Sequence, residues 1–175
     1  MKYIYDLDNT LVFTDQANNL AYNAALKKEG LDPILLPGRI TRETVLEVYP
    51  DLTDTQLARI ISNKKAVYSV EQTYVNGSLL RQAKRQGKNN CFIWSSADPE
   101  RASAVVDYHG LREWFSDIYF SKKTDISREI EDLSQYLSLS LQDMVVYEDT
   151  YKHIQELQRT GITVIDIMRC NLINT

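Results

Sequence analysis

Short apolar runs that end in polar residues recur along the chain, and they have the length of buried strands. A continuous apolar run bounded by polar or turn residues is typical of a strand that is covered on both faces of a sheet. These runs lie at 2–7, 91–94, 118–120, 144–147 and 162–167. We therefore predict a sheet of about five strands.

Between most of these runs, apolar residues recur every three or four positions, which is the period of an amphipathic helix. Thr53 and Gln56 have the spacing of a capping box, and Asp98-Pro99 has the pattern of an N-cap followed by a first-turn proline. The predicted helices cover 18–29, 41–48, 53–75, 79–86, 98–108, 126–137 and 150–159.

Alternating strands and helices predict an α/β fold, a Rossmann-like parallel sheet with helices on both faces. One interval breaks the alternation, because three or four helices separate the first strand from the second. We predict that 14–77 form a small α-helical cap inserted into a catalytic core built from 1–13 and 78–175.

Composition narrows the range of partners. The 175 residues carry a formal net charge of -4, which gives no electrostatic reason to expect nucleic acid or an anionic membrane as partner. No apolar run approaches the roughly 20 residues that span a bilayer, and the first residues show no signal-peptide pattern. Cys91 and Cys170 match no metal motif, and both are expected to be reduced. We expect a cytoplasmic protein, of undetermined oligomeric state.

Polar residues follow the predicted strands at the edge where parallel sheets bind ligands. They are Asp6, Asp8 and Thr10 after the first strand, Ser95 and Ser96 after the second, Lys122 and Lys123 after the third, and Glu148 and Asp149 after the fourth. Crowded carboxylates need a cation, and oxygen-only ligands favour Mg²⁺. A hydroxyl group and a lysine on neighbouring strands would bind phosphate oxygens and neutralise their charge. The pattern predicts a phosphate-transfer site with Asp6 as nucleophile and Asp8 as proton donor.

Four segments together resemble the motifs of the haloacid dehalogenase-like (HAD) hydrolases. Asp6-Leu7-Asp8-Asn9-Thr10 resembles the first motif, and Phe92-Ile93-Trp94-Ser95 resembles the second. Lys123 falls where the third motif has a lone lysine, and Val145-Val146-Tyr147-Glu148-Asp149 resembles the acidic fourth motif. The resemblance covers the whole predicted core, and four motifs at strand ends are more specific than any one of them.

The resemblance implies a role for each of these residues. Asp6 would be nucleophile and Mg²⁺ ligand, and Asp8 would be general acid and base and lend its backbone carbonyl to the metal. Ser95 would bind the phosphoryl group, with Lys123 steadying that group and Asp6. Asp149 would hold Mg²⁺, with Glu148 beside it, directly or through water. Lys122 remains the alternative lysine, Ser96 the alternative serine, and Ser96 and Thr10 are further candidates for contacts to the substrate.

The same resemblance bears on the type of reaction. Asp8 favours the phosphatase and phosphomutase branches, because dehalogenases of this family lack the second aspartate. Segments 38–43 and 63–65 resemble the cap of the β-phosphoglucomutase-like group, which implies that Arg42 reaches a far phosphate of the substrate. Asp98 replaces a phosphate-binding lysine of that group, which disfavours the mutase. We expect a Mg²⁺-dependent phosphatase acting on a small phosphorylated metabolite. The alternatives are a phosphomutase and a non-catalytic interaction protein on the same fold.

Overall fold

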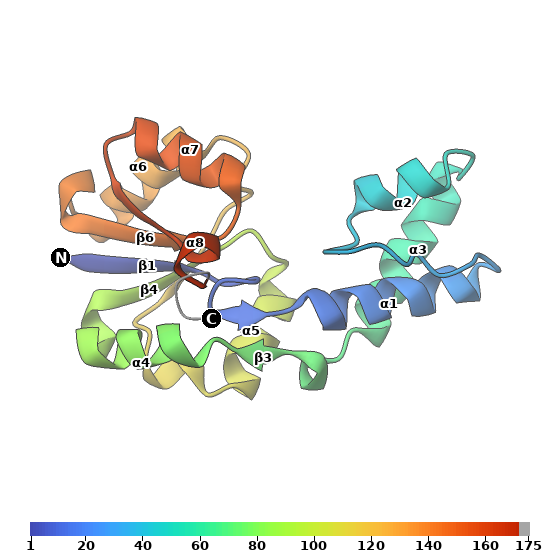
Figure 1. Ribbon diagram of the computed structural model, residues 1–175, viewed down its shortest axis with the longest axis horizontal. Helices are drawn as coiled ribbons and strands as arrows, with labels where there is room; N and C mark the ends of the chain where they lie inside the picture. Colours follow the sequence, from blue (N-terminus) through green and yellow to red (C-terminus); the bar gives the residue numbers. More distant parts are fainter. Residues whose placement is uncertain (172–175) are drawn as a thin grey trace. The chain divides into compact units, whose positions relative to one another are not determined.

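The computed structural model describes residues 1–171, and the chain divides into two compact units (Figure 1). The first unit contains Met1–Val12 and the chain from Val75 onward, and the second unit is Phe13–Tyr74. The second unit shares most of its residues with the predicted insertion. Residues 75–77 of that prediction belong to the first unit, and Phe13 belongs to the second.

The first unit is built on a five-stranded sheet in the order β5-β4-β1-β6-β7, in which every pair of neighbouring strands is parallel. The strands are β1 (Lys2–Asp6), β4 (Cys91–Ser95), β5 (Ile118–Phe120), β6 (Met144–Glu148) and β7 (Thr163–Asp166). Because β1 is central, its two neighbours bring their carboxyl ends to the edge where β1 ends. The predicted α/β fold with a parallel sheet of about five strands is confirmed.

Helices precede, connect and follow the strands of the first unit. They are α4 (Gly77–Gln86), α5 (Pro99–Tyr108), α6 (Ile126–Leu137), α7 (Tyr151–Arg159) and α8 (Ile167–Asn171), with short 3-10 turns η2 (Lys88–Asn90), η3 (Leu111–Glu113) and η4 (Leu141–Asp143). Asp98 accepts a hydrogen bond from the N–H of Arg101 at 3.3 Å and is the N-cap of α5, as predicted. The α6 span also matches its prediction.

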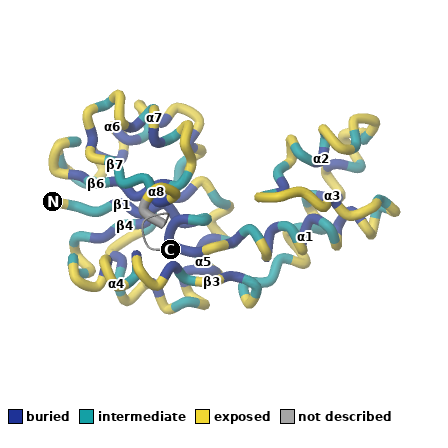
Figure 2. Tube along the Cα trace, in the orientation of Figure 1, coloured by how far each residue is buried: buried dark blue, intermediate teal, exposed yellow. Residues whose placement is uncertain are grey.

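The two faces of the sheet differ in chemistry. On one face, Ile4, Trp94 and Val146 pack in one apolar cluster with buried residues of α6 and α7, and the strands form the buried centre of the unit (Figure 2). On the other face, the ring of Tyr5 stacks on Tyr147 with 4.3 Å between centroids. The Tyr5 hydroxyl donates to Gln86 Oε1 of α4 at 2.6 Å, so this face carries a buried polar network. Burial raises the pKa of the Tyr5 hydroxyl far above its ordinary value.

The second unit is helical, with its own core of apolar side chains. Its elements are α1 (Asp15–Lys28), α2 (Arg42–Val48), α3 (Asp54–Val67) and the turn η1 (Val70–Gln72). The chain enters and leaves this unit through β2 (Val12–Phe13) and β3 (Tyr74–Val75), which pair with each other. The buried core is formed by Tyr22, Ala25, Leu26, Ile34, Ile40, Val45, Leu57 and Ile60.

The third predicted helix, 53–75, is partly wrong. Its start is confirmed, because Thr53 and Gln56 form the capping box. The helix ends at Val67, since Tyr68 adopts an extended backbone and the Ser69 hydroxyl accepts the N–H of Glu71 to begin a separate turn. The side-chain cap at Ser69 offers the backbone an alternative to continuing the helix.

Within residues 1–171, no helix is both long enough and apolar enough to cross a bilayer. Cys91 is a buried free thiol. The side chain of Cys170 lies outside the described part of the chain, and the expectation that it is reduced stays a prediction.

Candidate active site

The loop after β1 folds back on the strand that precedes it. The N–H of Leu11 donates to the carbonyl of Asp6 at 3.3 Å, and the N–H of Val12 donates to Leu7 at 2.9 Å. Asn9 adopts a left-handed backbone with φ of 59°, a conformation that asparagine tolerates better than most residues. The chain therefore stays at the carboxyl end of β1 and keeps Asp8 beside Asp6.

Strand register brings the serine and the acid pair to the same edge. Asp6 lies opposite Trp94 on β4, so Ser95 follows directly, and Tyr5 lies opposite Tyr147 on β6, so Glu148 follows directly. Ser95 is fully buried and its Oγ accepts the N–H of Ala97 at 3.1 Å. Ser96 is exposed. Ser95 is thus the serine that is fixed within the sheet edge.

Lys123 connects these strand ends through its ammonium group. Its Nζ donates to Asp6 Oδ1 at 2.6 Å and to Glu148 Oε2 at 2.8 Å. The same Nζ lies 4.6 Å from the centre of the Trp94 ring, close enough for a cation–π contact. Lys122 is exposed. Of the two lysines left open by the sequence, Lys123 is the one that contacts the acids.

The backbone at Lys123 explains why this lysine turns inward. Its φ is 51°, in the left-handed region that residues with a Cβ rarely adopt. Glu129 of α6 accepts the N–H of Lys123 at 2.7 Å and the N–H of Thr124 at 2.9 Å, which fixes this turn. Burial opposes the charge of Glu129, but hydrogen bonds from Ser121 and from this backbone lower the pKa of its carboxyl.

The charges of the cluster are strongly coupled. Burial raises the pKa of the Asp6 carboxyl well above its ordinary value; Lys123 counteracts this, and Glu148 adds to it. Burial alone would lower the pKa of Lys123, but attraction to Asp6 and Glu148 outweighs it and raises that pKa. Lys123 is therefore a permanent cation that favours ionised Asp6.

The two acids at the end of β6, Glu148 and Asp149, differ in their hydrogen bonds and in their pKa values. Both oxygens of Glu148 are engaged: Oε2 by Lys123, and Oε1 by the N–H groups of Asp149 at 3.2 Å and Thr150 at 3.0 Å. Burial opposes ionisation of Glu148, but the charge of Lys123 together with hydrogen bonds to the carboxylate outweighs it and lowers the pKa of this carboxyl. Burial, and then the charge of Glu148, raise the pKa of Asp149 to about 6. Asp149 accepts weakly from the buried hydroxyl of Thr10 at 3.5 Å.

The donor set fits a hard divalent cation. Asp6, Glu148 and Asp149 each offer one carboxylate oxygen, and these atoms all lie within 4.8 Å of one another. Carboxylate oxygens are the ligands that Mg²⁺ prefers. Because both oxygens of Glu148 already accept hydrogen bonds, Asp6 and Asp149 are better placed to bind the ion directly, and Glu148 is better placed to hold a metal-bound water.

Two residues of this edge were missed by the sequence analysis. Arg101 of α5 donates to both oxygens of Asp8, from Nη1 to Oδ1 at 2.9 Å and from Nη2 to Oδ2 at 2.7 Å. Asp98 leaves no lysine at that position, but Arg101 places a cation three residues later, in the first turn of the same helix. His153 also lies here, with Nδ1 3.6 Å from Glu148 Oε2. The contact of Arg101 leaves no signal in local sequence, since Asp8 lies 93 residues away along the chain.

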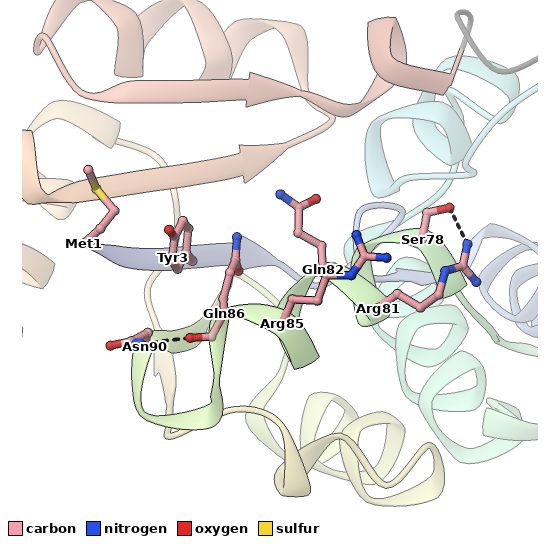
Figure 3. A pocket seen from close by; sticks show the side chains of 8 residues that line it. All are labelled: Met1, Tyr3, Ser78, Arg81, Gln82, Arg85, Gln86 and Asn90. Carbon is pink, nitrogen blue, oxygen red and sulfur yellow. Dashed lines mark hydrogen bonds between the residues drawn. The ribbon is translucent and has the colours of Figure 1, made fainter.

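The acidic cluster includes neither Arg42 nor any residue that lines a surface groove of the first unit. Arg42 is the exposed first residue of α2 and belongs to the second unit, so its contact with a substrate stays a prediction. A groove of about 900 Å³ runs beside α4 and the start of β1 in the first unit (Figure 3). None of the predicted site residues lines it. Its lining residues are Met1, Tyr3, Ser78, Arg81, Gln82, Arg85, Gln86 and Asn90.

The fold of the chain is that of the HAD-superfamily hydrolases, as comparison with solved structures shows. A predicted phosphoglycolate phosphatase from Haemophilus somnus 129PT superposes with a TM-score of 0.80 at 16% identity, over 94% of this chain and 84% of that one. A haloacid dehalogenase-like hydrolase from Streptococcus pneumoniae gives 0.75 at 16% identity, over 94% and 83% of the two chains. A HAD hydrolase from Entamoeba histolytica gives 0.72 at 21% identity, over 95% and 83%. A scan against protein-family models and a search of curated proteins gave no match.

Proposed function

We propose that this chain is a Mg²⁺-dependent phosphatase that hydrolyses a small phosphorylated metabolite through an aspartyl phosphate on Asp6. The observation that carries the proposal is the buried ion pair between Lys123 and Asp6, with Glu148 and Asp149 in the same cluster. A buried aspartate paired with a lysine, at the carboxyl end of the central strand, has the environment of a nucleophile. The fold shared with HAD hydrolases supports the same reaction class.

The reaction would proceed in two steps. A carboxylate oxygen of Asp6 attacks phosphorus, the bond from phosphorus to the ester oxygen breaks, and Asp8 gives its proton to the departing alcohol. Water then attacks the phosphorus of the aspartyl phosphate and loses a proton to Asp8. The bond to Asp6 breaks, inorganic phosphate leaves, and both carboxyl groups return to their starting states.

The remaining residues would hold the transferring group. Ser95, Lys123 and the backbone N–H groups after Asp6 would bind phosphoryl oxygens, where negative charge accumulates in the transition state. Mg²⁺, held by Asp6, Asp149 and the carbonyl of Asp8, with Glu148 directly or through water, would neutralise charge on the phosphoryl group. We further propose that the second unit, inserted between β2 and β3, acts as a cap that excludes water from the site.

The experiment is hydrolysis of p-nitrophenyl phosphate by the purified protein with Mg²⁺. We expect turnover that EDTA abolishes and that Asp6→Asn abolishes. Asp132→Asn, which changes an exposed aspartate on α6, is the matched control and should turn over like the unmodified protein. Turnover that survives Asp6→Asn, or that persists in EDTA, would contradict the proposal.

A further inference from the structure

Arg101 and Asp8 form a bidentate ion pair, which we call the clamp. The two hydrogen bonds of 2.9 and 2.7 Å use both carboxylate oxygens, and the side chains of Arg101 and Asp8 are only 16% and 21% exposed. A bidentate arginine–carboxylate pair is stronger and more directional than a single contact. Its arginine is the kind of group that recognises planar anions.

The clamp is anchored at the start of α5. Asp98 caps this helix by accepting the N–H of Arg101, and Pro99 occupies its first turn. β4 ends at Ser95 and α5 begins four residues later. The backbone of Arg101 therefore lies only a short distance along the chain from the end of the strand. The backbone that carries the Arg101 side chain is therefore held at the same edge of the sheet as Asp8.

The clamp conflicts with the role of Asp8 in the reaction proposed above. While both oxygens of Asp8 accept hydrogen bonds from Arg101, neither is directed at the ester oxygen of a substrate. Releasing an oxygen leaves a mostly buried guanidinium without part of its partner, which is unfavourable unless another anion takes its place. An anion on the alcohol side of the substrate, next to the ester oxygen, would be placed to do this.

We infer that Arg101 determines specificity, selecting phosphate esters whose alcohol carries an anionic group, a carboxylate or a second phosphate, close to the ester oxygen. The inference rests on the proposed phosphatase function. In a substrate of this class, the second anion replaces one oxygen of Asp8 as the acceptor for Arg101. Substrate binding thereby frees that oxygen of Asp8 to face the ester oxygen. A neutral alcohol lacks this exchange and is a poorer substrate.

The test uses pairs of esters that differ in one group. Phospholactate carries a carboxylate where isopropyl phosphate carries a methyl group, and ethylene glycol bisphosphate carries a phosphate where hydroxyethyl phosphate carries a hydroxyl. We expect kcat/KM to be at least about tenfold higher for the anionic member of one pair, the effect of one charge-assisted hydrogen bond. The pair that shows the preference identifies whether the recognised anion is a carboxylate or a phosphate.

The variants decide whether Arg101 is responsible. In Arg101→Gln the ratio of kcat/KM values should fall towards unity, and Arg101→Lys should keep part of it, because lysine retains the charge but not the fork. Arg112→Gln removes an exposed arginine that pairs with Asp107 of α5 and should keep the full ratio. Both kcat/KM values of a ratio are measured on the same preparation. A smaller fraction of folded protein lowers both values equally and leaves their ratio unchanged.

The failures of the two ideas are distinguishable. If no ester, including p-nitrophenyl phosphate, is hydrolysed, the proposed function is wrong and the inference falls with it. If p-nitrophenyl phosphate is hydrolysed but neither pair shows a preference, only the inference is overturned. It is also overturned if the preference survives Arg101→Gln, which is the result expected of an arginine with a purely structural role.

Discussion

Lys123 Nζ lies 2.6 Å from Asp6 Oδ1 and 2.8 Å from Glu148 Oε2, and all three side chains are almost completely buried. One ammonium group thus stabilises two buried negative charges. We therefore expect Lys123 to matter both to the proposed nucleophile and to the stability of this edge, with several measurable consequences.

Replacing Lys123 should destabilise the protein as well as inactivate it. Lys123→Met leaves two carboxylates buried without a cation, and breaking a buried pair in this way costs about 3–5 kcal/mol. Urea denaturation measures the free energy of unfolding. The exposed neighbour provides the control, since Lys122→Met should change that free energy by less than about 0.5 kcal/mol. Equal stabilities for the two variants would show that Lys123 is not the charge that the acids depend on.

Glu129 should stabilise the folded protein through the turn at Lys123 and Thr124 that it fixes. Glu129→Ala removes the acceptor for the N–H groups of Lys123 and Thr124 and should lower the free energy of unfolding at pH 7 by about 1–2 kcal/mol. Glu131→Ala, an exposed change on the same helix, is the control.

The stabilisation by Glu129 should also depend on pH with a defined sign. Because hydrogen bonds lower the pKa of Glu129 in the folded protein, its contribution is complete above its unfolded pKa of about 4.3 and is lost as pH falls through the folded value. The difference in unfolding free energy between the unmodified protein and Glu129→Ala should therefore shrink below about pH 4. A difference that grows on acidification would contradict this assignment.

Mg²⁺ should stabilise the folded protein through Asp149. A ligand present at a hundred times its dissociation constant adds about 2.7 kcal/mol to the free energy of unfolding, which thermal denaturation detects as a rise in Tm. Asp149→Asn should remove most of this rise, whereas Asp132→Asn should keep it. If Asp149→Asn responds to Mg²⁺ like the unmodified protein, the ion is bound elsewhere.

Asp8→Asn should separate the two chemical steps. p-Nitrophenol leaves without a proton, so formation of the aspartyl phosphate should continue, while its hydrolysis loses the base that activates water. We expect an initial burst of nitrophenol equal to the amount of enzyme, followed by turnover slowed by about 10²–10⁴-fold. Stopped-flow absorbance measures both phases. Slow release without a burst would mean that Asp8 serves the first step, and unchanged turnover would mean that it serves neither.

Much of the fold could be predicted from the sequence, because it depends on local patterns. Apolar runs gave the strands, and Asp98-Pro99 gave the start of α5. The end of α3 could not be predicted in this way. Its apolar spacing continues past Val67, and only the capped turn at Ser69 and the pairing of β3 with β2 divert the chain.

The candidate site was predictable to the extent that parallel strands end at one edge. Asp6, Ser95 and Glu148 meet there because the strand order makes them neighbours. The choice of Lys123 over Lys122 depends on a left-handed backbone that Glu129 stabilises, which no residue pattern announces. The clamp of Arg101 on Asp8 joins residues from different elements and becomes visible only in three dimensions.

The most direct measurement of the central claim is the site of phosphorylation. Asp8→Asn would be incubated with Mg²⁺ and an aryl phosphate carrying labelled phosphorus, quenched in acid, digested and mapped by mass spectrometry. The proposed mechanism predicts label on the peptide that contains Asp6, at Asp6 itself, and no label when Asp6→Asn is added. Turnover by the unmodified protein together with label on another residue, or with label that persists in the double variant, would contradict it.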